Sequence, residues 1–125
     1  MRDHRKLEVF ALADALALRV YEVTQRFPDD ERYGLTAQLR KAAVSVAANI
    51  VEGAARPSQA DFLRLLSIAY ASACELDYEI SLARRLGYVP PPAGPEMTDR
   101  TSQMCRALRG LIVALRSNER VRASM

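Results

Sequence analysis

The side chains best suited to chemistry are arginines near the C-terminal end of the sequence. The segment 100–122 holds six arginines and one acid, Glu119, so its net charge is +5. If this segment is helical, four of the arginines fall within a sector of roughly 80°, opposite a leucine stripe. These four are Arg106, Arg109, Arg116 and Arg120. Several cations along one surface suit contacts with nucleic-acid phosphates. The pattern also fits a solvated helix face, and the segment lacks aromatic residues that could stack on bases.

Arg40 and Lys41 form a second basic site near the middle of the chain. In a helix they project about 100° apart, so they cannot clamp one small ligand. Lys41 is a candidate nucleic-acid contact. Arg40 lies near an apolar face, where it could pair with an acid across a subunit interface.

The inventory of side chains argues against an enzyme. The only histidine, His4, precedes the first predicted helix, so the core offers no Ser-His-acid or Cys-His arrangement. Glycine patterns for phosphates or dinucleotides are missing from the sequence. A carboxylate metal site from Glu52, Glu75 and Glu79 is an alternative, but the di-iron pattern of helical bundles also needs histidines. The sequence therefore predicts a protein that is not an enzyme and needs no cofactor or metal.

Apolar residues recur at helical spacing in four segments. The predicted helices span residues 7–27, 31–55, 58–86 and 98–117. Ser58 is expected to cap the third helix, and the proline-rich stretch 89–95 to form an extended connection. The residues after Arg116 are expected to fray. These features predict an all-α, antiparallel up-down four-helix bundle that forms a single domain over residues 1–125.

The second predicted helix is apolar on two sides, and the third also has more apolar surface than one contact requires. A helix needs only one apolar stripe to join a monomeric bundle. The simplest neighbour for the second stripe is another copy of the chain, so the sequence predicts a homo-oligomer. The residues expected at its interface are Ala37, Arg40, Val44, Ala48, Val51, Leu63, Tyr70 and Tyr78.

Polar residues run between the two apolar sides of the second predicted helix. Ser45, Asn49 and Glu52 lie along this seam, and Glu75 is the acid expected to face it from the third helix. Buried amides and carboxylates must be paired or they destabilise a fold. We therefore expect these four residues to form a structural polar network, with Ser72 or backbone groups as further partners.

Composition bounds the remaining possibilities. The chain has 125 residues and a formal charge of +3, and of its 18 basic residues only Lys6 and Lys41 are lysines. Arginine suits bidentate contact with carboxylate or phosphate. No apolar run approaches the length of about 20 residues that spans a bilayer, and the start lacks the pattern of a signal peptide, so a cytoplasmic protein is expected. Cys74 and Cys105 are expected to be free thiols.

The stretch 38–53 also carries a family resemblance. Gln-Leu-Arg-Lys-Ala-Ala-Val-Ser at 38–45 and Asn-Ile-Val-Glu-Gly at 49–53 resemble the signature of the small four helix bundle proteins, whose founding members are encoded in intervening sequences of bacterial 23S rRNA genes. The likeness extends over about residues 10–90, through Phe27-Pro28, 31–35, Glu75-Leu76 and 86–88. Ala47 stands where proline is frequent in the family, and Ala71-Ser72-Ala73 where a Gly-Ser pair is usual.

This family is similar to the accessory variability determinant proteins of diversity-generating retroelements, which are five-fold barrels that work with a reverse transcriptase and its RNA. The resemblance implies a ring-like homopentamer with a role near RNA. Two functions follow as hypotheses. The first is an RNA-associated accessory or scaffold oligomer that uses its arginine surface. The second is an adaptor or structural oligomer that binds a protein partner and has no nucleic-acid role.

Overall fold

The computed structural model describes residues 2–124 and contains four long helices, with no strand in that range. The helices are α1 (Glu8–Thr24), α2 (Leu35–Ala55), α3 (Gln59–Arg85) and α4 (Ala93–Ser124). Two short 3-10 turns, η1 (His4–Lys6) and η2 (Asp29–Glu31), precede α1 and α2. The prediction of an all-α chain with four helices is confirmed.

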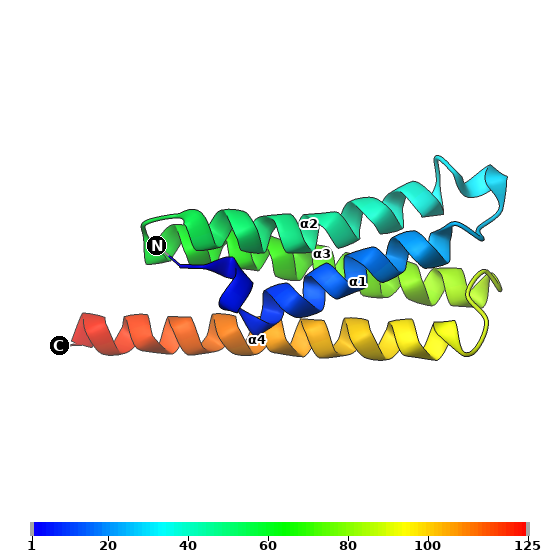
Figure 1. Ribbon diagram of the computed structural model, residues 1–125. Helices are drawn as coiled ribbons and strands as arrows, with labels where there is room; N and C mark the ends of the chain where they lie inside the picture. The colour runs from blue at the N-terminus through cyan, green and yellow to red at the C-terminus, as the bar shows by residue number, and fades with distance from the viewer. Residues whose placement is uncertain (1, 125) are drawn as a thin grey trace.

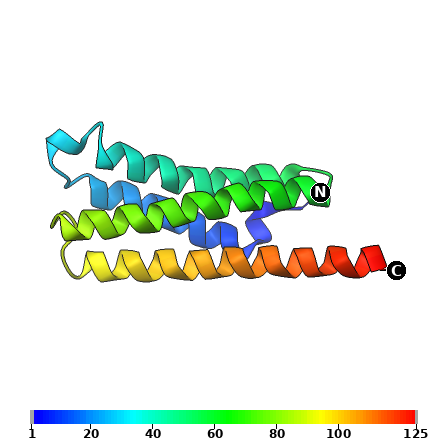
Figure 2. The ribbon, with the colours of Figure 1, turned by 180° about the vertical axis from the view of Figure 1, so that it is seen from behind.

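Consecutive helices run antiparallel, as Figures 1 and 2 show from opposite sides. Each helix packs against its neighbours in the order α1, α2, α3, α4, and α4 closes the bundle against α1. The diagonal pairs, α1 with α3 and α2 with α4, have backbones that stay more than 8 Å apart between Cα atoms. The chain is therefore an up-down bundle in which α2 and α3 share the most extensive contact.

The core follows the apolar spacing of the helices. Its largest fully buried side chains come from all four of them: Leu16, Val20, Val46, Ile50, Leu66, Leu76, Thr101, Met104 and Leu108. Each buried leucine or isoleucine contributes about 1.5–3 kcal/mol through removal of apolar surface from water. Thr101 is tolerated there because its hydroxyl donates to the carbonyl of Met97 at 2.7 Å.

Helix α1 is shorter than α4, with 17 residues against 32, so the C-terminal part of α4 extends past the start of α1 (Figure 1). The chain before α1 folds over the neighbouring end of the bundle. Arg2 donates its backbone N–H to the carbonyl of Ala54 at 3.2 Å and a guanidinium N–H to the carbonyl of Arg56 at 3.0 Å. Its guanidinium also lies 4.2 Å from the centre of the Phe62 ring. This arm therefore covers the α2–α3 turn.

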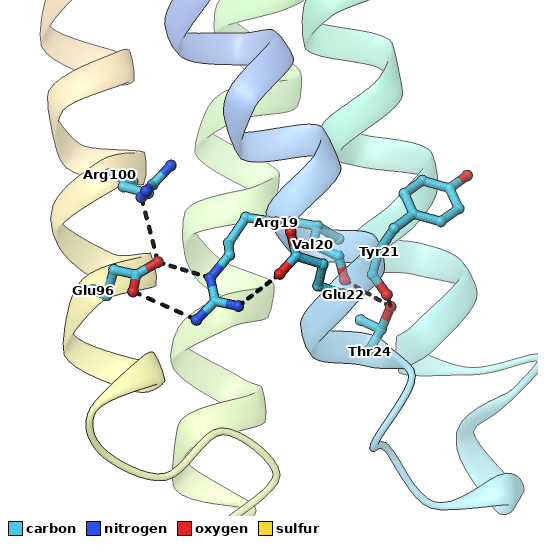
Figure 3. Close-up of polar contacts among 7 residues, drawn as sticks. All are labelled: Arg19, Val20, Tyr21, Glu22, Thr24, Glu96 and Arg100. Carbon is cyan, nitrogen blue, oxygen red and sulfur yellow. Dashed lines mark hydrogen bonds and ion pairs between the residues drawn. The ribbon is translucent and has the colours of Figure 1, made fainter.

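An ion-pair cluster joins α1 to the first turn of α4 (Figure 3). Arg19 donates from Nε to Glu96 Oε1 at 2.8 Å and from Nη1 to Glu22 Oε2 at 3.1 Å. Arg100 lies 3.4 Å from the same oxygen of Glu96. The Arg19 contact lowers the pKa of the Glu96 carboxyl. Glu96 also lies at the positive end of the α4 dipole, which favours its negative charge. Its ion pair with Arg19 holds the start of α4 against α1.

The start of α3 agrees with the prediction, whereas the start of α2 differs from it. Ser58 caps α3 as predicted, accepting from the N–H of Asp61 at 3.1 Å. Helix α2 was expected to start near residue 31 but begins at Leu35, because residues 29–31 form the separate turn η2. Glu31 accepts from the N–H of Leu35 at 3.1 Å.

The predicted limits of the fourth helix were wrong at both ends. The helix begins at Ala93 within the proline-rich stretch, and Pro95 lies in its first turn, where a missing N–H removes no helical hydrogen bond. Thr98, the first residue of the predicted helix, lies inside the observed one and accepts a hydrogen bond from Arg84. The expected fraying after residue 116 is replaced by helix to Ser124. Arginine and alanine in this segment are favourable helix formers.

No helix within residues 2–124 is both long enough and apolar enough to span a lipid bilayer.

Candidate nucleic-acid interface and association surface

The four predicted arginines of α4 form an exposed line along this helix. Arg106, Arg109, Arg116 and Arg120 are all exposed, and none of them makes an ion pair with an acid in residues 2–124. Arg106 donates to the hydroxyl of Ser102 at 2.8 Å, which orients its guanidinium without neutralising it. We call these four residues the α4 arginine line. Its positive charge is available to an anionic partner.

Lys41 is not part of this surface. It is exposed on α2, which lies diagonally across the bundle from α4. The sequence had grouped Lys41 with the four arginines as a candidate nucleic-acid contact. The structure separates them within one chain.

The outer side of α2 exposes the small and β-branched residues that the sequence had assigned to an interface. Ala37, Val44 and Ala48 are exposed, with 45% of Val44 accessible, and Val51 is half-buried. Other apolar side chains left exposed on the adjoining helices are Leu18 and Tyr21 of α1 and Ile68 of α3. We call Val44, Ala48, Leu18, Tyr21 and Ile68 the α2 surface. Sequence reasoning missed its last three members, although Leu18 stands outside the core spacing of α1.

Two predicted interface residues are occupied within the chain. Leu63 is only 8% exposed and belongs to the core, so its assignment to an interface is corrected. Arg40 donates to the hydroxyl of Thr24 at 2.9 Å and stacks over Tyr21 at 4.6 Å. A hydroxyl group and an aromatic ring of α1 therefore hold the Arg40 guanidinium, which does not need an acid from another subunit.

The two predicted interface tyrosines lie apart from the α2 surface. Tyr70 is half-buried against the core, whereas 60% of Tyr78 is exposed. Both stand four residues from Cys74 on α3, so all three follow one line along the helix. Burial raises the pKa of Cys105 on α4 to about 11, and Cys74 is close enough to contribute to this rise. Tyr70 and Tyr78 therefore face the α4 side of α3.

The polar network forms in part. Ser45 and Ser72 join α2 to α3 through their hydroxyls at 2.8 Å, and Asn49 donates to the Ser45 carbonyl at 2.8 Å and hydroxyl at 3.1 Å. Glu52 lies outside this group, because it pairs with Arg56 at 2.9 Å on the surface of α2. Glu75 is exposed, and within the described part of the chain it forms no hydrogen bond with Ser45, Ser72 or Asn49.

A buried acid on the same flank of α3 was missed as a structural feature. Glu79 is 7% exposed, and its Oε1 atom is the one buried side-chain oxygen or nitrogen in residues 2–124 that lacks a hydrogen-bond partner. Burial, followed by the negative charge of Glu75 and a hydrogen bond with it, raises the pKa of Glu79 to about 7. Glu79 lies three residues after Leu76 and four before Ala83, a spacing that places it on the buried side of α3. Carboxylates are seldom buried, so the sequence did not suggest this position for it.

The carboxylates do not assemble into a metal centre. Glu52 pairs on α2, while Glu75 and Glu79 lie one turn apart on α3. No group of three or more His, Cys, Asp or Glu residues within the described range is arranged to hold a metal ion. The alternative of a site built from all three glutamates therefore loses its geometric basis.

Comparisons place the chain among known proteins. A family model described as 23S rRNA-intervening sequence protein matches residues 5–110. A crystal structure of a protein with unknown function from the S23 ribosomal protein family of Bacteroides thetaiotaomicron superposes with a TM-score of 0.77. It is 23% identical and the alignment covers 83% of this chain and 97% of that one, so it supports the fold alone. No curated protein matches the chain. Since the family model covers most of its length, the chain belongs to the 23S rRNA-intervening sequence protein family.

Proposed function

We propose that this chain is a non-enzymatic, cytoplasmic accessory or scaffold protein that forms a homo-oligomer and associates with RNA. The observation that supports this most directly is the α4 arginine line, in which four exposed guanidinium groups have no acidic partner in residues 2–124. Arginine forms bidentate contacts with phosphate, and contacts of this type favour a polyanion over a compact neutral ligand. Membership of a family named for intervening sequences in 23S rRNA is consistent with this proposal.

The number of charges decides how strong such binding can be. Each phosphate that the protein neutralises releases counterions, so the binding constant for a single strand falls as the salt concentration rises. On a plot of log K against log salt concentration, each phosphate contact contributes a slope of about −0.7. Four arginines in one chain give a modest interaction by this measure. A ring of copies would repeat the line around the assembly and raise its local potential. The proposed RNA association therefore depends on the proposed homo-oligomer.

Reversing three charges of the α4 arginine line should abolish RNA binding while the bundle stays folded. The variant is Arg106→Glu, Arg109→Glu and Arg116→Glu, and all three side chains are exposed, so the core is unchanged. The measurement is the ratio of absorbance at the nucleic-acid and protein maxima after purification without nuclease. Association at physiological salt should fall by at least a hundredfold, because three attractive phosphate contacts become repulsive.

The matched control reverses three charges elsewhere. Arg26 and Arg32 are exposed in the α1–α2 connection and Lys41 is exposed on α2, so none of the three belongs to the α4 arginine line. Their replacement by glutamate gives the same change in net charge. Equal RNA retention by both triple variants, or equal loss from both, would remove the α4 arginine line as the binding surface.

The α2 surface supports the proposal of a homo-oligomer. A ring-like pentamer is the assembly that the family resemblance implies, and a head-to-tail contact that closes on itself would build it. A single apolar side chain on the outside of a bundle is common and needs no partner. A contiguous group of such side chains, however, marks an association site. Val44 lies on α2, which packs between the two helices that supply the other members of this surface, α1 and α3.

Val44→Asp should split the assembly into folded monomers. A charge at the centre of an apolar contact would be desolvated without a partner, which costs several kcal/mol for each interface. Val113→Asp is the matched control, since Val113 is 51% exposed on α4 and Val44 is 45% exposed. Light scattering gives the mass of each variant and circular dichroism its helicity. An intact assembly in the Val44 variant would show that the interface lies elsewhere.

The second candidate function uses the same α2 surface. An adaptor that binds a different protein through Val44 and its neighbours would also need exposed apolar residues there. A pull-down dominated by one protein and unaffected by nuclease, together with a monomeric mass, would favour this adaptor over the RNA-associated oligomer.

A further inference from the structure

An open cavity at the surface lies between the end of α3 and the start of α4, where the two helices run side by side in both ribbon views (Figures 1 and 2). It has a volume of about 360 Å³ and is lined by Ser81, Arg84, Arg85 and Thr98. Two guanidinium groups and two hydroxyls supply hydrogen-bond donors, and no carboxylate lines the cavity. The volume is within the range of small-ligand sites, so a phosphate and the sugar attached to it can enter.

Both arginines are held in place but keep unused donors. Arg84 donates from Nη1 to the hydroxyl of Thr98 at 2.8 Å, which ties α3 to α4. Arg85 donates from Nε to the carbonyl of Ser81 at 3.3 Å. Neither forms an ion pair with an acid in the described part of the chain. Their remaining N–H groups match the bidentate geometry that phosphate oxygens accept.

Close packing beside the cavity explains why Arg84 reaches α4. Gly94 is buried in the first turn of α4, and a Cβ atom added there would overlap the carbonyl of Val89 and approach Arg84 Nε to 2.9 Å. The absence of a side chain at Gly94 lets the α3–α4 connection fold tightly around the arginine. Gly94 therefore shapes the connection beside the cavity and contacts the stem of Arg84, one of its four lining residues.

An exposed aromatic ring stands on the same helix, one turn before the cavity. Tyr78 is 60% exposed and precedes Ser81 by three residues, so both lie on neighbouring positions of α3. Farther along, Cys74 of α3 is close to Cys105 of α4, which directly precedes Arg106. The α3–α4 face thus presents the cavity, Tyr78 and the start of the α4 arginine line in that order. From Thr98 to Arg109 it covers about 16 Å at the rise of an α-helix.

We propose that the cavity lined by Arg84 and Arg85 is a phosphate seat, and that it holds a backbone phosphate of single-stranded RNA whose next bases stack near Tyr78. This assignment rests on the proposed RNA association and names the form of RNA. Single-strand binders combine a cationic track with exposed aromatic rings, because every base has a face that can stack. Asp77 opposes binding, since its carboxylate lies near Cys105 between the seat and the arginine line.

The test measures fluorescence anisotropy of a labelled oligouridylate of about 12 nucleotides, a length within the site sizes of single-strand binders. Arg84→Gln with Arg85→Gln should weaken binding about tenfold and lower the salt slope by about 0.7, the value for one lost phosphate contact on a single strand. Arg26→Gln with Arg32→Gln removes the same charge at the α1–α2 connection and should leave both values nearly unchanged. Tyr78→Ala should weaken binding by about fivefold or more, whereas Tyr78→Phe should preserve it.

A second readout separates the seat from the RNA proposal. Inorganic phosphate is titrated into the wild-type protein while the arginine Nε–H signals are followed by NMR, and Arg84 and Arg85 should shift selectively. Phosphate binding at the seat without RNA binding by the wild type would overturn the single-stranded RNA assignment and point to a free phosphate ligand. RNA binding that is equal in the wild type and the Arg84/Arg85 double variant would overturn the seat and leave the α4 arginine line standing. Binding of neither probe overturns both.

Discussion

Leu76→Ala should lower the free energy of unfolding by about 3–5 kcal/mol, a large part of the total stability of a small domain. Leu76 is completely buried in the middle of α3. This helix packs against both α2 and α4, so neighbouring helices on two sides prevent the space left by the shortened side chain from collapsing. Urea unfolding followed by far-ultraviolet circular dichroism measures the change.

Leu18→Ala is the matched control, because it makes the same substitution where 64% of the side chain is exposed. In the isolated bundle it should change stability by less than about 0.5 kcal/mol. Leu18 belongs to the α2 surface, so a larger effect should appear only at protein concentrations where copies associate. A concentration-independent loss as large as that of Leu76→Ala would mean that Leu18 is buried within one chain, contrary to the fold described.

The helices were predictable because their apolar spacing records which residues are buried. The core positions of α2, such as Leu39, Val46 and Ile50, follow one stripe, and the second stripe contains Val44, which is indeed exposed. Spacing alone cannot say which stripe a neighbouring helix of the same chain covers. For that reason Leu63 was assigned to an interface although α3 buries it in the core.

The start of α4 could not be predicted for a different reason. Proline ends a helix when it stands in the interior but is favourable in the first turn, so Pro95 is compatible with either reading. Because the helix starts at Ala93 instead of Thr98, Thr98 lies inside it and accepts a hydrogen bond from Arg84. The cavity beside it depends on the register between two helices, and residues 81–85 and 98 carry no sequence pattern that fixes this register.

The buried acid leads to the second prediction. Glu79→Gln should stabilise the chain by about 2–3 kcal/mol at pH 8 and change its stability little near pH 4.5. The pKa of Glu79 is raised to about 7 from its ordinary value of 4.5, first by burial and then by Glu75. Glutamine has nearly the same shape and carries no charge, so it removes the penalty of ionising a group that is 7% exposed.

The sign of the pH dependence follows from the protons bound. Between about pH 4.5 and 7 the folded chain keeps the Glu79 proton, whereas the unfolded chain has lost it. Folding therefore takes up a proton in this window, and the contribution of Glu79 to stability falls as pH rises until the folded-state pKa is passed. Above that point the difference between wild type and Glu79→Gln should be constant. Thermal unfolding at a series of pH values measures both limits.

The charges around Glu79 supply the control. Glu75 lies one turn away on α3, and the register set by Ser45 and Ser72 places the turn of α2 with Gln38 and Lys41 opposite the two glutamates. Glu75→Gln removes the neighbouring negative charge but leaves the burial, so it should lower the pKa of Glu79 and recover only part of the stabilisation. An identical pH profile for wild type and Glu79→Gln would show instead that Glu79 is ionised without penalty. Lys41, in the facing turn of α2, is then the basic side chain expected to neutralise it, and Lys41→Gln would destabilise the wild type selectively above pH 7.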